Sequence, residues 1–122
     1  MESIWSQTCE IKPRDSLKGN AETEVAVIGA GMAGILIASK LQEKGHKVIV
    51  LEADRIAGGQ TKNTTAKITS QHGIIYSKLL STFGREKAKQ YAMANEMAIR
   101  EYRKIISERG IKCDLEEKRS YV

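Results

Sequence analysis

The chain has 122 residues, about the length of one small domain, and its 41% hydrophobic and 29% charged residues exclude a wholly disordered protein. The formal net charge is +5, but basic and acidic residues alternate without a long tract of one sign, which disfavours nucleic-acid binding. Two cysteines fit neither a disulfide framework nor a four-ligand zinc site, and the longest uncharged stretch, residues 25–39, is too short for a membrane span.

Residues 1–23 are polar, contain the only proline, Pro13, and lack periodicity apart from the Ile4-Trp5 pair. We interpret them as an N-terminal arm, which is either a flexible leader or is held by packing of Trp5 on the domain. No secretory signal peptide is recognisable, so the expected location is the cytoplasm.

A strand, a helix and a second strand follow in close succession. Val25 to Ile28 is an apolar run typical of a parallel strand that is buried on both faces. Residues 32–44 have a wide apolar face that predicts a helix, and Gly45 stands where a left-handed C-cap belongs. Residues 47–52 form a second β-branched run. The pattern predicts an α/β fold with a Rossmann-like βαβ unit and parallel strands.

Residues 53–71 break this rhythm with Gly58-Gly59 and a series of threonines and serines. They predict a long ordered loop, and such loops inside compact domains are usually functional. A short helix is expected over residues 74–83.

Residues 85–109 carry the strongest helical pattern, and Gly110 is the expected C-terminal stop. Beyond it, alternation over residues 111–115 predicts a strand, and residues 120–122 resemble the start of another. The residues that share the apolar face of the long helix are Ala88, Tyr91, Ala92, Asn95, Ala98, Ile99, Tyr102, Ile105 and Ile106.

The motif with chemical meaning is Gly29-Ala30-Gly31-Met32-Ala33-Gly34, a G-x-G-x-x-G that follows the first strand and opens the helix. Gly29 permits a tight turn, Gly31 leaves room for a pyrophosphate, and Gly34 lets the helix pack close to the strands. Glu52 ends the next strand 18 positions after Gly34, where a carboxylate accepts ribose hydroxyls and repels a 2′-phosphate, so NADP is disfavoured. The alternative is that these are ordinary packing glycines beside a solvated Glu52.

Two dinucleotides fit such a turn. In nicotinamide-binding domains the second strand normally leads into another crossover helix, whereas here it leads into the Gly- and Thr-rich loop. Hydroxyls and bare backbone amides beyond the pyrophosphate suit a longer cofactor, so the sequence favours FAD over NAD.

The residues from Gly29 to Glu52, with Ala38, Leu41, Gly45, Val48 and Leu51 at their spacing, resemble the FAD fingerprint of glutathione-reductase-like flavoproteins. Residues 52–61 (EADRIAGGQT) and 64–67 (TTAK) resemble the D-amino-acid-oxidase-like (DAO) branch. Residues 64–76 and the leader Ser3-Ile4-Trp5 are similar to the subgroup whose full-length members end in a Rieske [2Fe-2S] domain. The resemblance covers nearly the whole chain.

This resemblance implies roles for further residues. The glycine motif would line the pyrophosphate, Glu52 would hold the adenosine ribose, and Arg55 would lie near the adenosine. The remaining cofactor contacts would continue towards the isoalloxazine. The complete set of implied cofactor-binding residues is Gly29, Ala30, Gly31, Met32, Ala33, Gly34, Glu52, Ala53, Arg55, Gly59, Gln60, Thr61, Thr65 and Ala66.

No residue is identified as catalytic. His72 and Lys67 invite a role at the flavin, but a lone loop histidine is more often structural and a lysine is more often solvated. The C-x-H and C-x-x-H pairs that hold a Rieske cluster do not occur, so a [2Fe-2S] cluster is expected only if a Rieske domain follows.

Three readings of function stay open. Residues 24–122 are the truncated N-terminal part of an FAD-binding domain, from an oxidoreductase that acts on an amine or amino acid by hydride transfer to flavin N5. Alternatively, they are the first βαβ unit of an NAD-dependent dehydrogenase or a non-catalytic interaction module. The expected partners are FAD and a small substrate, and we expect the segment alone to be inactive and to self-associate through an open sheet edge.

Overall fold

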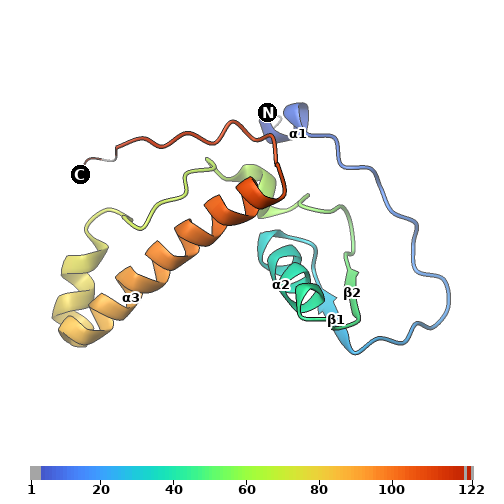
Figure 1. Cartoon of the computed structure of the whole chain (residues 1–122), viewed down its shortest axis with the longest axis horizontal. Coiled ribbons are helices and arrows are strands. Elements are labelled where there is room, and N and C mark those ends of the chain that lie inside the picture. The colour runs from blue at the N-terminus through green and yellow to red at the C-terminus, as the bar shows by residue number, and fades with distance from the viewer. Residues whose placement is uncertain (1–3, 120, 122) are drawn as a thin grey trace. The chain divides into compact units, whose positions relative to one another are not determined.

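The structure, a computed structural model, describes residues 4–119 and 121. Its elements are α1 (Ile4–Thr8), β1 (Val25–Ile28), α2 (Met32–Glu43), β2 (Val48–Leu51), the 3-10 helix η1 (Gln60–Asn63) and α3 (Ile75–Glu108) (Figure 1). They fall into two compact units, Met1–Thr65 and Ala66–Val122.

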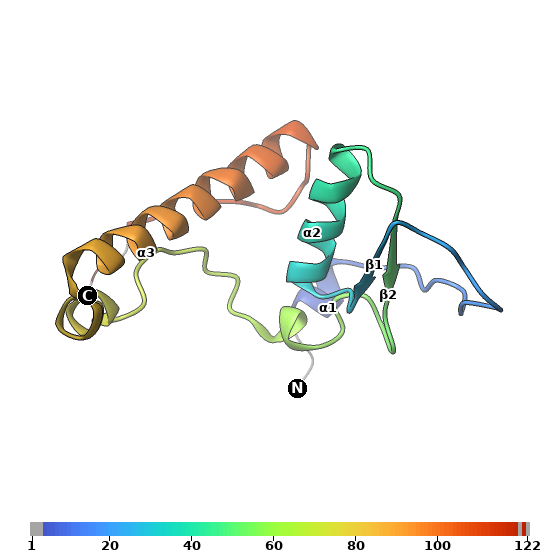
Figure 2. The same ribbon diagram turned by 90° about the horizontal axis from the view of Figure 1, so that it is seen from below.

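The first unit contains the βαβ arrangement that the sequence predicts. β1 and β2 pair in parallel, with Val25 beside Val48 and Ile28 beside Leu51. Helix α2 packs against both strands, as Figure 2 shows. The predicted helix is one residue too long, because Lys44 is already its C-cap.

Burial of the sheet differs from the expectation. β1 alternates between half-buried and exposed residues, and Ile28 is 79% exposed. Helix α2 covers one face only, and burying the second face of a parallel sheet requires another layer on that side. The prediction that β1 is buried on both faces is therefore wrong for the chain as it stands.

Helix α2 ends as the sequence predicts. Gly45 has a φ of 86°, its N–H donates to the Gln42 carbonyl at 2.9 Å, and the next N–H, of His46, donates to the Leu41 carbonyl at 3.1 Å. These two bonds are the Schellman motif, which uses a left-handed residue to satisfy the last helical carbonyls.

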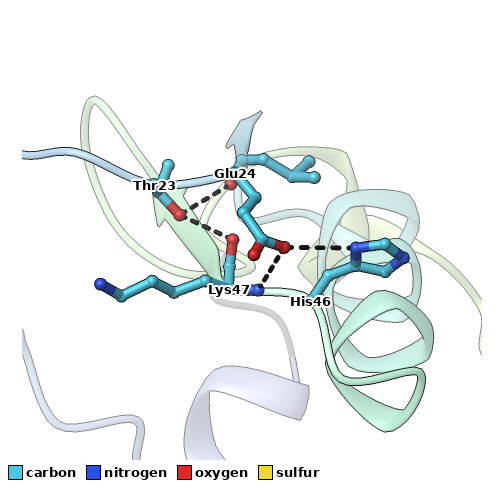
Figure 3. Close-up of polar contacts among 5 residues, drawn as sticks. Thr23, Glu24, His46 and Lys47 are labelled. Atoms are coloured by element: carbon cyan, nitrogen blue, oxygen red, sulfur yellow. Dashed lines mark hydrogen bonds and ion pairs between the residues drawn. The ribbon is translucent and has the colours of Figure 1, made fainter.

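A polar cluster joins the amino ends of the two strands (Figure 3). The Thr23 hydroxyl donates to the Lys47 carbonyl at 2.7 Å, and the Lys47 N–H donates to Glu24 Oε2 at 3.1 Å. The same oxygen lies 3.3 Å from His46 Nδ1. The cluster fixes where the chain enters β2 after the end of α2.

The second unit is built around α3. Gly84, with φ 77° and ψ 174°, interrupts the helical backbone, so the two helices that the sequence predicts over residues 74–83 and 85–109 meet at a kink. The rings of Tyr76 and Tyr91 make an edge contact across this kink, with centroids 6.0 Å apart. Ala88 is buried, and the predicted apolar face is otherwise half-buried except at Ala98, which is exposed.

We expect Gly84→Ala to destabilise the second unit by about 1–2 kcal/mol, because an L side chain is strained at this φ. A Cβ at Gly84 would meet no atom within 4 Å, so the effect is conformational and not steric. Thermal unfolding followed by circular dichroism measures it, with Lys87→Ala at an exposed position of the same helix as the control. Equal or higher stability of Gly84→Ala would contradict the strained backbone.

The strand predicted over residues 111–115 of the C-terminal segment is a second prediction that the structure contradicts. Gly110 ends α3 with a φ of 58°, and the Ile111 N–H donates to the Ile106 carbonyl at 2.9 Å, as expected for a Schellman stop. Residues 111–115, however, form no strand. Asp114 has a φ of 48°, which breaks the extended run, and the described part of this unit offers no strand to pair with. Of the strand predicted over residues 120–122, the first and last lie outside the described residues.

In residues 4–23, the described part of the N-terminal arm, regular structure is confined to α1, which the sequence did not predict. Residues 9–23 contain neither helix nor strand, and they are exposed except for Thr23. The side chains of Ile4 and Trp5 lie outside the described part, so docking of Trp5 stays a prediction. Within the described residues, no helix combines the length and the apolar character needed to cross a bilayer.

Candidate functional site

The glycine-rich turn between β1 and α2 is the centre of the candidate site. Gly29 turns the chain with a φ of 98°, and its N–H donates to the Leu51 carbonyl at 2.7 Å. Ala30 is only 1% exposed, and Gly31 is the extended N-cap of α2. The turn is thereby fixed to the end of β2, and because α2 begins directly after it, the first N–H groups of α2 lie at the turn.

Gly34 sets the distance between α2 and the turn. A Cβ at this position would overlap the Gly29 carbonyl oxygen and would lie 3.3 Å from Val27 Cγ1. Only glycine lets the first turn of α2 approach β1 this closely. Gly31 is less restricted, because a Cβ there would be 3.5 Å from Thr61 Oγ1.

Glu52 binds the glycine turn through its side chain. Oε2 accepts from the Ala30 N–H at 2.7 Å, and Oε1 accepts from the Asp54 N–H at 3.1 Å. These bonds, the one from Ala30 most of all, hold the pKa of Glu52 below its ordinary value of 4.5. Glu52 is therefore a charged, exposed carboxylate at physiological pH, and each oxygen retains a lone pair that can accept a further hydroxyl.

The loop after β2 folds back over the same turn. The Ala57 N–H donates to the Ala30 carbonyl at 2.9 Å, and the Met32 N–H donates to Thr61 Oγ1 at 3.1 Å. Thr61 lies in η1, where the Thr64 hydroxyl also donates to its carbonyl at 3.2 Å. Two segments far apart in sequence thus meet at the amino end of α2.

Seven of the predicted site residues come together in this way: Gly29, Ala30, Gly31, Met32, Gly34, Glu52 and Thr61. The other predicted residues of the first unit are exposed and are not brought into this hydrogen-bonded cluster by their side chains: Ala33, Ala53, Arg55, Gly59, Gln60 and Thr65. Ala66, also exposed, begins the second unit.

Sequence reasoning missed Asp54 and Ala57. Both act through backbone N–H groups, and the identity of a side chain does not indicate which acceptor its backbone N–H will meet. Ala57 has a φ of 57°, unusual for alanine, and it precedes Gly58-Gly59, so the glycine pair was the only local signal of a tight turn here.

His72 and Lys67 belong to the second unit and are exposed. His72 Nδ1 lies 3.4 Å from the Tyr91 hydroxyl, and the Tyr76 hydroxyl donates to the Ser70 carbonyl at 2.6 Å. These contacts attach the loop before α3 to the helix, so the described partner of His72 is a structural one. Within residues 4–119 and 121, no three acidic, histidine or cysteine side chains gather as metal ligands would.

Residues 24–122 match the FAD dependent oxidoreductase family, DAO. A Bacillus subtilis protein, YhfW, named as a Rieske 2Fe-2S iron-sulfur protein, is 34% identical over 99% of this chain and 24% of its own length. An L-amino-acid oxidase of Bothrops moojeni is 34% identical over 94% of this chain and 19% of its own length. The chain thus spans a quarter or less of these relatives. No solved structure was found to match it.

Proposed function

We propose that this chain, which belongs to the family of FAD-dependent oxidoreductases, holds the ADP half of FAD at the glycine turn. The observation that carries the proposal is the joint placement of Glu52 and the amino end of α2. Glu52 Oε2 accepts from the Ala30 N–H at 2.7 Å, so the carboxylate stands at the start of the turn, and Met32 N–H stands at its end.

The residues present fit this cofactor. Gly31 supplies the bare backbone that a pyrophosphate needs for close approach, Gly34 lets α2 pack close to the turn, and the helix dipole of α2 favours the negative charge of the pyrophosphate. Glu52 has spare lone pairs for the two hydroxyls of the adenosine ribose. Arg55, Gly59, Gln60, Thr65 and Ala66 are proposed to continue the contact along the cofactor, with Ala33 and Ala53 flanking it.

For the whole protein we propose oxidation of an amine or amino acid. When bound, FAD supplies the acceptor, at its N5, for a hydride from the substrate C–H bond. Relatives named L-amino-acid oxidases, from Bothrops moojeni and Echis ocellatus, support this substrate class. This chain contributes binding and orientation of the cofactor, and no side chain in it is assigned to proton transfer. A [2Fe-2S] cluster belongs to the proposal only if the protein also contains a Rieske domain, as the name of YhfW suggests for that relative.

The loop after β2 supports FAD over NAD. Between β2 and α3 the described chain contains only the four-residue η1, where a nicotinamide-binding domain places a crossover helix. For the whole protein, purified natively, the expected result is a flavin absorbance, with flavin released on denaturation. Thermal protection by NAD and not by FAD would favour a dehydrogenase instead.

We expect the chain of 122 residues alone to bind FAD more weakly than micromolar and to turn nothing over. Its described sheet has two strands with open outer edges, and Ile28 is 79% exposed, so few apolar walls exist to bury an isoalloxazine ring. The open edges also favour dimers or larger species. Fluorescence quenching by added FAD measures the affinity, and light scattering measures the mass of the species in solution. Micromolar or tighter binding by a monodisperse monomer would contradict the prediction.

A further inference from the structure

The Thr61 hydroxyl stands where the proposed phosphate must bind. Thr61 Oγ1 accepts from the Met32 N–H at 3.1 Å, across 29 positions of sequence. It also lies 3.5 Å from where a Cβ on Gly31 would be, directly over the bare backbone of the turn. A side chain from the loop therefore caps α2, although the N-cap residue Gly31 provides no side-chain cap.

The loop is arranged to keep the hydroxyl in place. The Ala57 N–H donates to the Ala30 carbonyl, which fixes the start of the loop on the turn. At the two ends of η1, Asn63 Nδ2 donates to the Gly59 carbonyl at 3.4 Å and the Thr64 hydroxyl donates to the Thr61 carbonyl at 3.2 Å. Thr61 is half-buried, whereas its neighbours Gln60 and Lys62 are exposed.

We propose that Thr61 is an internal cap that occupies the phosphate position and is displaced when the dinucleotide binds. One N–H group makes one strong hydrogen bond, so a phosphate oxygen and Thr61 Oγ1 compete for the Met32 N–H. Binding must break the internal bond first, which lowers affinity for the phosphate, while the bond protects the amino end of α2 in the cofactor-free chain. The inference rests on the function proposed above.

The test compares two ligands and three variants of the full chain by NMR. ADP carries the competing phosphates, whereas adenosine lacks them and serves as the matched control ligand. Thr61→Val removes the hydroxyl and keeps the shape of the side chain. Thr61→Ala also removes the hydroxyl and shows whether a result depends on how valine packs. Thr61→Ser keeps the hydroxyl. Titrations followed at the backbone amides give the dissociation constants.

We expect Thr61→Val and Thr61→Ala to bind ADP about threefold more tightly than the wild type, as loss of one partly exposed competing hydrogen bond implies. Thr61→Ser should bind ADP as the wild type does, and adenosine should bind equally to all four proteins. Without ligand, hydrogen exchange at the Met32 amide should be faster in Thr61→Val than in the wild type or Thr61→Ser.

Equal or weaker ADP binding by Thr61→Val would overturn the proposal and make Thr61 a bystander or a direct phosphate ligand. A different result marks failure of the proposed function: no ADP binding by any variant, while hydrogen exchange at Met32 still responds to Thr61→Val. In that case Thr61 caps the helix but no dinucleotide displaces it, and the displacement proposal fails with the function.

Discussion

Replacing Gly34 with alanine is expected to destabilise the first unit by about 2 kcal/mol or more. Helix propensity alone predicts the opposite sign, because alanine is more favourable than glycine inside a helix by about 1 kcal/mol. The new Cβ, however, would overlap the Gly29 carbonyl oxygen, a backbone atom that cannot rotate away. Relief requires α2 to move off β1, so the steric term exceeds the propensity term.

Urea unfolding followed by circular dichroism measures this effect. Ala33→Gly, one residue earlier at an exposed position of the same helix, is the matched control because it changes propensity without changing packing. We expect the control to lose about 1 kcal/mol. A Gly34→Ala variant more stable than the wild type would show that α2 does not need its close approach to the turn.

Replacing Glu52 with glutamine is expected to lower both stability and ADP affinity in a pH-dependent way. The carboxylate accepts from the Ala30 and Asp54 N–H groups, and a glutamine can offer only one oxygen to these two donors. Hydrogen bonds to a charged acceptor are stronger than those to a neutral one, so ADP affinity should fall about tenfold when the turn loses its anchor. Calorimetric titration with ADP at pH 7 measures this loss.

The sign of the pH dependence follows from the lowered pKa of Glu52. A carboxyl whose pKa is lower in the folded state stabilises the fold fully above its unfolded value, here 4.5, and loses that contribution as the pH falls through the lowered value. The difference in urea midpoint between wild type and Glu52→Gln should therefore be largest near neutrality and vanish in acid, where glutamine mimics the protonated side chain. Glu22→Gln on the exposed arm is the charge-matched control; a difference that is constant with pH would contradict the role of the charge.

Much of the site could be predicted because its signals are local. Gly29, Gly34 and Gly45 each stand where a turn, a close packing contact or a left-handed cap needs glycine, and the flanking apolar runs set the strands. The position of Glu52 follows from the length of the βαβ unit. That unit could therefore be derived from spacing, apart from the last residue of α2 and the two outer residues of the strand predicted over residues 47–52, since β2 spans only Val48–Leu51.

The errors arise where the outcome depends on distant partners. Alternation over residues 111–115 predicts a strand, but a strand needs a neighbour, and the described part of its unit provides none. The apolar pattern of β1 predicts two covered faces, yet Ile28 is exposed because α2 covers one side only. Likewise the bond from Met32 to Thr61 spans 29 positions, and a threonine in a loop does not indicate which amide it will meet.

Hydrogen bonds join β1 and β2 at both of their ends, and this affects the order in which the chain folds during synthesis. Thr23 and Glu24 bind Lys47 at one end, and at the other end Gly29 binds Leu51 and Ala30 binds Glu52. These contacts join residues 22–24 positions apart, all within residues 23–52, so none of them needs a residue beyond Glu52. The glycine turn can therefore take shape as soon as Glu52 leaves the ribosome, before the residues of α3 have been translated. A nascent chain would therefore form its glycine turn before the second unit has been synthesised.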